Sequence, residues 1–134
     1  MARKKVRQRP QVGALGKALT RRSHGACELC SSKEEPFPWE IPPFPTEPEL
    51  ERTLLACKRC RRWLEGAEIK PVEAYFLSTA VWSEEPAVRL AAARLLLAVD
   101  DPSDPWMQDA LDAVDVDPAT GEFRETPISN DFGV

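Results

Sequence analysis

The sequence predicts an α+β fold, mostly α-helical, in which a small finger holding all the cysteines precedes a cluster of helices. The cysteines form two pairs with the spacing Cys-x-x-Cys, namely Cys27–Cys30 and Cys57–Cys60. Between the pairs, many prolines and an alternation of apolar residues favour short strands over helix. After the second pair, apolar residues recur every three or four positions, which is typical of one buried helix face.

Length and composition indicate one domain outside the membrane. The chain has 134 residues, of which 43% are hydrophobic, enough for one modest core. No apolar run reaches the roughly 18 residues of a membrane span, and no apolar stretch typical of a signal peptide follows the basic start. We therefore expect a cytoplasmic protein with no membrane partner, in which paired cysteines bind metal more readily than they form disulfides.

The net charge of −4 conceals an uneven distribution of charge. Residues 1–24 contain eight Lys or Arg and no acid, whereas residues 100–134 contain ten Asp or Glu and one Arg. A charged run is often only a solvated surface, but a basic head and an acidic tail also suit a nucleic-acid arm and a solubilising end. We predict a disordered basic arm at residues 1–11, one domain at 12–117 and an acidic tail at 118–134.

We assign the finger to residues 19–66, and we expect one helix at each of its ends. The first covers residues 12–23, where apolar residues at i, i+3 and i+7 share one face. The second covers residues 58–65, begins within the second cysteine pair and ends at Gly66, a residue that commonly terminates helices.

Two strands are expected between these helices. The segment 36–48 contains six prolines, which exclude a helix and favour an extended chain. Phe37, Trp39 and Ile41 alternate within it, as in a short edge strand. Residues 53–56 form the second strand, so that a hairpin leads into the second cysteine pair.

The helical part is expected at residues 70–117. Three helices are predicted there, over 72–79, 84–99 and 105–114. Each start has a suitable residue, because proline fits the first helical position and Ser or Asp fits the N-cap; these residues are Pro71, Ser83, Asp104 and Pro105. Beyond residue 117 we expect turns and a tail.

The cysteine pairs predict a zinc site. Four thiolates presented by two short turns suit the tetrahedral geometry of Zn²⁺, which we expect as the cofactor. The predicted metal ligands are Cys27, Cys30, Cys57 and Cys60. A site filled by four thiolates has no position for substrate, so it predicts a structural role. Disulfides and a redox pair are the alternatives.

A cysteine turn, a hairpin and a second cysteine pair that opens a helix follow the layout of a treble-clef zinc finger. Segments 22–30 and 54–60 resemble the zinc-bound ββα-metal unit of HNH nucleases. That pattern expects Asp-His before a proline and a histidine after the last cysteine, but this chain has Glu40-Ile41 and Arg61 there. A general base and most ligands of a catalytic metal are therefore missing. The sequence leaves enzyme activity undecided and leans towards none.

A second resemblance covers residues 19–117. Five segments occur in the order found in the zinc-binding N-terminal region of the PhnA-like family: 22–30, 39–43, 57–60, 81–88 and 106–112. The resemblance implies a zinc ribbon or treble clef followed by helices, and it implies no established reaction.

We predict a zinc-binding, non-catalytic module that contacts nucleic acid, either DNA or RNA, through its basic N-terminal region. Such contacts to phosphates are electrostatic and position a protein without reading sequence. The expected contact residues are Arg3, Lys4, Lys5, Arg7, Arg9, Lys17, Arg21, Arg22, Arg59, Arg61 and Arg62. The alternatives are a protein-interaction adaptor with a protein partner, a degenerate HNH-like hydrolase and a phosphonate-associated hydrolase.

Aromatic side chains are a second means of binding nucleic acid, because bases stack on them. Trp82 and Trp106 each begin a predicted helix beside apolar residues, so we expect both in the core. Trp39, in the proline-rich segment, is the best candidate for an exposed stacking residue.

Overall fold

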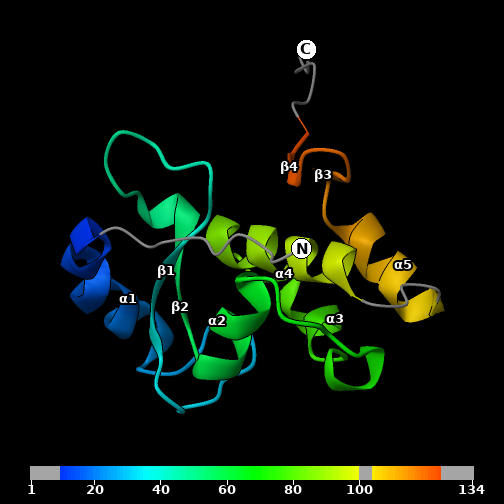
Figure 1. Cartoon of the computed structure of the whole chain (residues 1–134), viewed down its shortest axis with the longest axis horizontal. Helices are drawn as coiled ribbons and strands as arrows, with labels where there is room; N and C mark the ends of the chain where they lie inside the picture. The colour runs from blue at the N-terminus through cyan, green and yellow to red at the C-terminus, as the bar shows by residue number, and fades with distance from the viewer. Residues whose placement is uncertain (1–9, 100–103, 125–134) are drawn as a thin grey trace.

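Helices and two small antiparallel sheets make up the part of the chain that the computed structural model describes, residues 10–99 and 104–124 (Figure 1). The α-helices are α1 (Gly16–Ser23), α2 (Lys58–Leu64), α3 (Leu77–Ala80), α4 (Pro86–Ala98) and α5 (Pro105–Ala113). The strands are β1 (Phe37–Glu40), β2 (Thr53–Ala56), β3 (Val116–Asp117) and β4 (Glu122–Phe123). The predicted combination of helices with a small hairpin is confirmed. Residues 1–9, which make up most of the expected basic arm, lie outside the described residues.

The β1–β2 hairpin forms at the two predicted places, with β1 at the alternating apolar residues and β2 at residues 53–56. The two strands are antiparallel, and Phe37 pairs with Ala56 while Glu40 pairs with Thr53. Every residue of β2 is buried, because α1, α2 and α4 pack against the strand. β1 pairs with one edge of β2, and the first cysteine turn meets the other, where the backbone N–H of Glu28 donates to the carbonyl of Leu55 at 2.8 Å. The hairpin therefore places the start of β1 and the end of β2 beside the cysteines.

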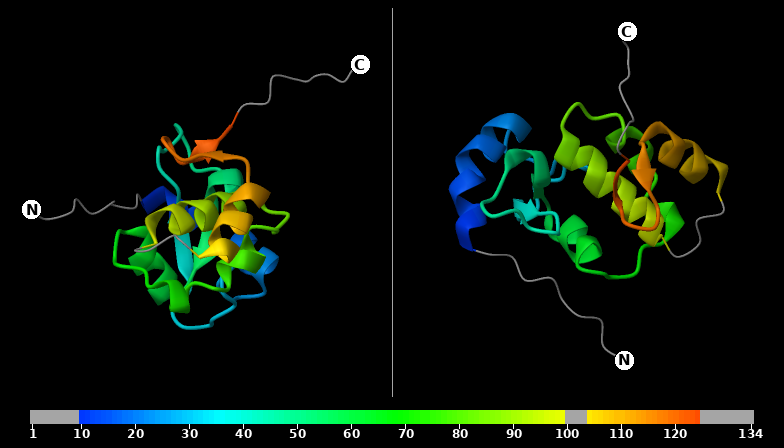
Figure 2. Two further views of the ribbon diagram at one scale, coloured as in Figure 1. Left: turned by 90° about the vertical axis from the view of Figure 1, so that its right-hand side faces the viewer. Right: turned by 90° about the horizontal axis from the view of Figure 1, so that it is seen from above.

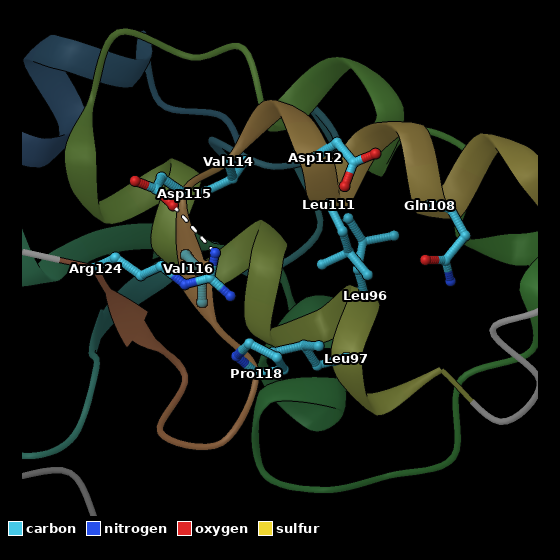
Figure 3. Close-up of a pocket in the computed structure, with 10 residues that line it drawn as sticks. All are labelled: Leu96, Leu97, Gln108, Leu111, Asp112, Val114, Asp115, Val116, Pro118 and Arg124. Atoms are coloured by element: carbon cyan, nitrogen blue, oxygen red, sulfur yellow. Dashed lines mark ion pairs between the residues drawn. The ribbon is translucent and has the colours of Figure 1, made fainter. Parts of the chain in front are cut away.

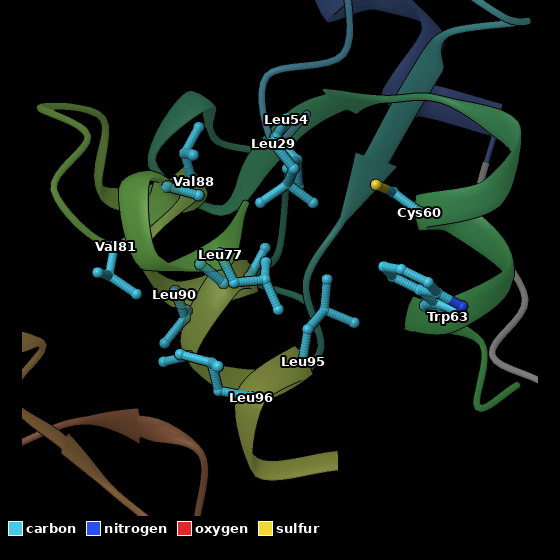
Figure 4. Close-up of a cluster of buried hydrophobic side chains, with 14 of the residues drawn as sticks. Leu29, Leu54, Cys60, Trp63, Leu77, Val81, Val88, Leu90, Leu95 and Leu96 are labelled. Carbon is cyan, nitrogen blue, oxygen red and sulfur yellow. The ribbon is translucent and has the colours of Figure 1, made fainter. Parts of the chain in front are cut away.

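Helix α4 is the centre of the core, and α1 and α5 lie at opposite ends of the molecule on either side of it (Figure 1). It packs against β2, α2, α3 and α5. Its buried residues point to more than one side: Ala87, Val88, Leu90, Ala91, Ala92, Ala93, Leu95 and Leu96. The alanines let neighbouring elements approach closely, and each buried leucine stabilises the fold by roughly 1.5–3 kcal/mol. Figure 4 shows Leu90, Leu95 and Leu96 among side chains from α2, α3 and β2.

Two helix predictions need correction at their starts. The helix expected over 12–23 begins as a 3₁₀ turn, η1 (Pro10–Leu15), and becomes α-helical only at Gly16. The helix expected from residue 84 begins at Pro86, because proline has no N–H to donate and fits the first position. Ser83 does not cap it directly, since its hydroxyl accepts a hydrogen bond from the N–H of Glu85 (3.1 Å) one step before the helix.

The helix expected over 72–79 is divided into a 3₁₀ turn, η3 (Pro71–Glu73), and the single-turn helix α3. Val72 is 85% exposed and Tyr75 is 63% exposed, whereas Ala74 and Leu77 are buried. The break lies at Ala74, whose backbone (φ −108°, ψ 7°) leaves the helical conformation before α3 begins at Leu77.

A second hairpin, β3–β4, occupies residues at which we expected turns and the start of the acidic tail. Its turn is closed by Asp117, whose carbonyl accepts the N–H of Gly121 at 2.7 Å and whose carboxylate accepts the N–H of Ala119 at 2.9 Å. Gly121 has φ +70°, a conformation that favours glycine. Figure 2 shows this hairpin lying over α4. Residues 125–134 lie outside the described residues.

Two arginines hold this hairpin against the rest of the fold. The Glu122 carboxylate accepts two hydrogen bonds from Arg52, both at 3.0 Å, and one from Arg94 at 2.6 Å. Both guanidinium groups also donate to the carbonyl of Pro42, at 2.7 and 2.6 Å. One carboxylate therefore links the proline-rich segment, the end of 3₁₀ turn η2 (Leu50–Arg52), α4 and β4.

The ionisation of Glu122 is coupled to this contact. Partial burial by itself raises the pKa of the carboxyl, but the hydrogen bonds and charges of Arg52 and Arg94 outweigh burial and lower the pKa below its ordinary value of 4.5. A group whose pKa is lowered by folding stabilises the protein above its unfolded pKa, and this stabilisation is lost as the pH falls through the folded pKa.

Replacement of Glu122 by Gln is expected to lower the free energy of unfolding by roughly 1 kcal/mol at pH 7, because the amide removes the charge that both arginines face. The difference should begin to shrink below about pH 4.5, where the carboxyl of the unfolded chain becomes neutral, and should be lost as the pH falls through the lower pKa of the folded state. Urea unfolding at pH 7 and pH 3 measures both values. Glu84→Gln, at an exposed position, is the matched control. An effect of Glu122→Gln that is equally large at pH 3 would contradict the ionic contribution.

Candidate metal centre and the surrounding basic surface

The four cysteines converge at one place. Their sulfur atoms all lie within 4.8 Å of one another, with Cys30 Sγ 3.6 Å from Cys57 Sγ and 3.9 Å from Cys60 Sγ. A tetrahedral zinc with bonds of about 2.3 Å requires sulfur separations of about 3.8 Å. All four thiols are free, and Cys27, Cys57 and Cys60 are buried. The predicted ligands are therefore together in a closed cluster that can hold a metal ion.

The chain reaches this arrangement through two different local structures. Cys27 and Cys30 belong to a tight turn after α1, in which the N–H of Leu29 points at Cys27 Sγ (3.4 Å) and the N–H of Ser31 donates to the Cys27 carbonyl (2.9 Å). Cys57 is the N-cap residue of α2, and Cys60 lies in the first turn of that helix. Backbone N–H groups near both pairs favour thiolate charge.

The thiols strongly affect one another. Hydrogen bonds from the Cys27 and Cys60 thiols lower the pKa of Cys30. The hydrogen bond to Cys30 is the main cause that raises the pKa of Cys27 to about 11, and the hydrogen bond to Cys27 is the main cause that raises the pKa of Cys60. Cys27 and Cys60 therefore hold their protons more firmly than a free thiol does. Metal binding would replace these protons, so affinity should fall as the pH is lowered.

Arg22 and Glu28 fix the first cysteine turn on the hairpin. Arg22 donates to both oxygens of Glu28, at 2.7 and 2.9 Å, and to the carbonyl of Thr53 at 2.9 Å. Glu28 also accepts the N–H of Leu55 at 2.8 Å, and its side chain is only 6% exposed. Arg22, which we expected at a nucleic-acid surface, is therefore committed to a mostly buried ion pair.

Replacement of Glu28 by Gln is expected to lower the free energy of unfolding by about 3 kcal/mol, because removal of one partner leaves a mostly buried guanidinium without its main counter-charge. Thermal or urea unfolding measures the loss. Glu34→Gln, four residues past the turn at an exposed position, is the matched control. Equal stability of the two variants would contradict a structural role for this pair.

The other expected contact residues have different environments. Lys17, Arg21, Arg59 and Arg62 are exposed. Arg61 is half-buried and donates to the carbonyls of Ala56 and Glu35. The remaining expected residues lie outside the described residues: Arg3, Lys4, Lys5, Arg7 and Arg9. Lys58, exposed beside Cys57, belongs with the exposed cations, and our sequence analysis did not include it.

Two aromatic residues, Trp39 and Trp82, have the opposite exposure from the one expected, and a third, Phe37, is an additional exposed ring. Trp39 is only 2% exposed, so it is not an exposed stacking residue, because β1 turns it into the core. Trp82 is 72% exposed and so is not in the core, because it follows α3 in a turn before α4 begins. Phe37, two residues before Trp39, is 64% exposed at the outer end of β1. The sequence pattern indicated a strand that carries both Phe37 and Trp39, but only the position of the core decided that Trp39 is covered and Phe37 is not.

Glu40, the one acidic candidate in the HNH-like pattern, is fully buried at the end of β1. A catalytic carboxylate must contact substrate, water or a catalytic metal. In this fold Glu40 is covered on all sides, so the arrangement does not supply an accessible base at the place where the HNH pattern has one.

A separate cavity of about 390 Å³ lies between α4, α5 and the β3–β4 hairpin (Figure 3). Leu96, Leu111 and Val116 line its apolar side. Its charged lining residues are Asp112, Asp115 and Arg124, and Arg124 pairs with Asp115 at 3.6 Å. None of the four cysteines lines the cavity, and Figure 1 shows the β3–β4 hairpin and α2 on opposite sides of α4, so the cavity is not part of the metal centre.

Comparisons with known proteins do not identify the chain. No family model, no curated protein and no solved structure matches it. The resemblance to the PhnA-like family therefore stays a prediction. None of the helices in the described residues is both long and apolar enough to cross a membrane.

Proposed function

We propose that this protein is a non-catalytic module that is stabilised by bound zinc and that binds nucleic acid through the basic residues around its finger. The observation that supports the zinc assignment is the closed cluster of four sulfurs. Thiolate ligands select zinc over the harder cations, and four of them leave no position for substrate. The order of cysteine turn, hairpin and helix supports a treble-clef-like finger. The five ordered motif segments support membership of the PhnA-like family, which we also propose.

Zinc would add a direct link between the first cysteine turn and the start of α2. The first cysteine turn contributes the buried Leu29 and the Glu28 contacts, whereas the second pair belongs to α2, which is only two turns long. Helices this short are not stable alone in water. The metal therefore supplies folding free energy as well as geometry.

Replacement of any one of the four cysteines by Ser is expected to unfold the finger, because zinc binding contributes folding free energy of about 10 kcal/mol. Zinc content by mass spectrometry and thermal unfolding, each with and without a chelator, measure the effect. Lys58→Ser, an exposed position between Cys57 and Cys60, is the matched control. Unchanged zinc content and stability in all four variants would contradict the proposed site.

The exposed cations support the nucleic-acid part of the proposal. Lys17 and Arg21 lie on α1, and Lys58, Arg59 and Arg62 lie on α2, so cations occur on both helices of the finger. Arg59 lies 4.8 Å from the Trp63 ring centre and 5.0 Å from that of Phe76, which holds its charge over an aromatic surface. Phosphate groups would contact such residues without regard to sequence.

Labelled duplex DNA and single-stranded RNA are both expected to bind the zinc-loaded protein, with affinity that falls steeply as salt rises. Fluorescence anisotropy over a series from 50 to 300 mM salt measures the slope. The double variant Lys58→Glu, Arg62→Glu should weaken binding to all sequences alike, whereas Arg124→Glu, on the far side of α4, should not. Deletion of residues 1–9 should reduce both the affinity and the salt slope. Absence of binding at 50 mM salt would contradict the nucleic-acid function.

A protein-interaction adaptor is the second candidate, because one specific surface favours it. Val72 and Tyr75 are 85% and 63% exposed, and the Tyr75 ring meets Trp106 edge-on with centres 5.1 Å apart. These residues line a shallow pocket together with Lys70 and Asp104. Apolar side chains grouped in this way often mark protein contacts. Binding of a protein that is insensitive to salt would favour this second function.

A further inference from the structure

We propose that Phe37 is a base-stacking site for single-stranded nucleic acid, at one side of a groove between α1 and β1. This inference rests on the proposed nucleic-acid function and adds to it a class of ligand and a place of contact. Phe37 was not among the residues expected to bind nucleic acid.

The groove has an apolar floor and a size suited to a nucleotide. Its volume is about 660 Å³, which is within the usual range of small-molecule sites. Residues of η1 and α1 form one wall and residues of β1 form the other; the lining residues without charge are Gly13, Gly16, Thr20, Pro36, Phe37, Pro38 and Leu55. A Cβ built on Gly13 or Gly16 would meet no atom within 4 Å, so the backbone of this wall is open to a ligand.

Phe37 has the exposure and the support that a stacking residue needs. Its side chain keeps 64% of its surface accessible although it is large and apolar. The guanidinium of Arg61 lies 5.4 Å from the ring centre and is held there by its hydrogen bonds to the carbonyls of Ala56 and Glu35. The antiparallel pairing of Phe37 with Ala56 fixes the backbone. The ring is therefore accessible and positioned before any ligand arrives.

The charges around the groove match a phosphate backbone. Lys17 and Arg21 both line it, and they lie on the same side of α1 because they are four residues apart. Arg61 places a third cation at the Phe37 end. Proteins that bind single strands combine cations along the backbone with aromatic rings on which bases stack.

The ring favours a single strand over a duplex. Bases in a duplex are stacked on one another and are not free to stack on a side chain, whereas those of a single strand are. Cations alone would bind either form. A contribution from Phe37 should therefore appear with single strands and be small or absent with duplexes.

The test is fluorescence anisotropy of a labelled 12-nucleotide oligo-dT strand, and of a duplex that contains it, with the full zinc-loaded chain at 50 mM salt. Phe37→Ala is expected to weaken single-strand binding by roughly 5- to 150-fold, the effect of losing one stacked base. Phe37→Tyr keeps an aromatic ring and should retain affinity within about twofold. Trp82→Ala, at another exposed aromatic residue, is the matched control and should have no effect.

The outcomes separate this inference from the proposed function. If Phe37→Ala binds the single strand as well as the wild type does, the stacking site is overturned and the electrostatic function stays intact. Loss of binding in Lys17→Glu but not in Phe37→Ala has the same meaning. Equal loss of single-strand and duplex affinity in Phe37→Ala would also overturn it. No binding by the wild type would overturn both. Urea unfolding of Phe37→Ala, expected to match the wild type because the side chain is exposed, shows that loss of binding is not loss of folding.

Discussion

The convergence of four sulfurs is the constraint on which the N-terminal half of this fold depends. Atoms from a turn after α1 and from the start of α2 lie within 4.8 Å of one another, although the β1–β2 hairpin and its proline-rich loop separate them in sequence. A hairpin and a helix of two turns bury too little surface to be stable separately. A cation at this point would compensate the charge of the thiolates, and it would also define the orientation of α2 against α4.

Two ion-pair networks complete the fold around that point. Arg22 and Glu28 join the first cysteine turn to β2, while Arg52, Arg94 and Glu122 join α4 to the C-terminal hairpin. Both networks also satisfy backbone groups, such as the Pro42 carbonyl and the Leu55 N–H, that the short strands leave unpaired. These arginines are therefore structural, and the cations available to a ligand are a smaller set than the sequence contains.

The surface that remains combines charge with an aromatic residue in one place. Lys17 and Arg21 face the same groove as Phe37, and the groove begins at η1, directly after the basic residues 1–9. The cysteine cluster has a different proposed role: it is closed, and a metal ion bound there would hold in place the strands and helices that carry these side chains. The proposed contact surface and the cysteine cluster thus occupy neighbouring but separate parts of the finger.

The sequence by itself determined the features that depend on local spacing. Two Cys-x-x-Cys pairs identified the sulfur cluster, alternation identified the first strand of the first hairpin, and helical periodicity identified α4 and α5. Tertiary structure alone decided which side chains are covered, because burial depends on elements distant in sequence. It placed Trp39 in the core and left Phe37 and Trp82 exposed, it used Arg22 in an ion pair, and it ordered a hairpin at residues 116–123 through two arginines from elsewhere in the chain. No local pattern contains that information, since each contact is made between segments that meet only after folding.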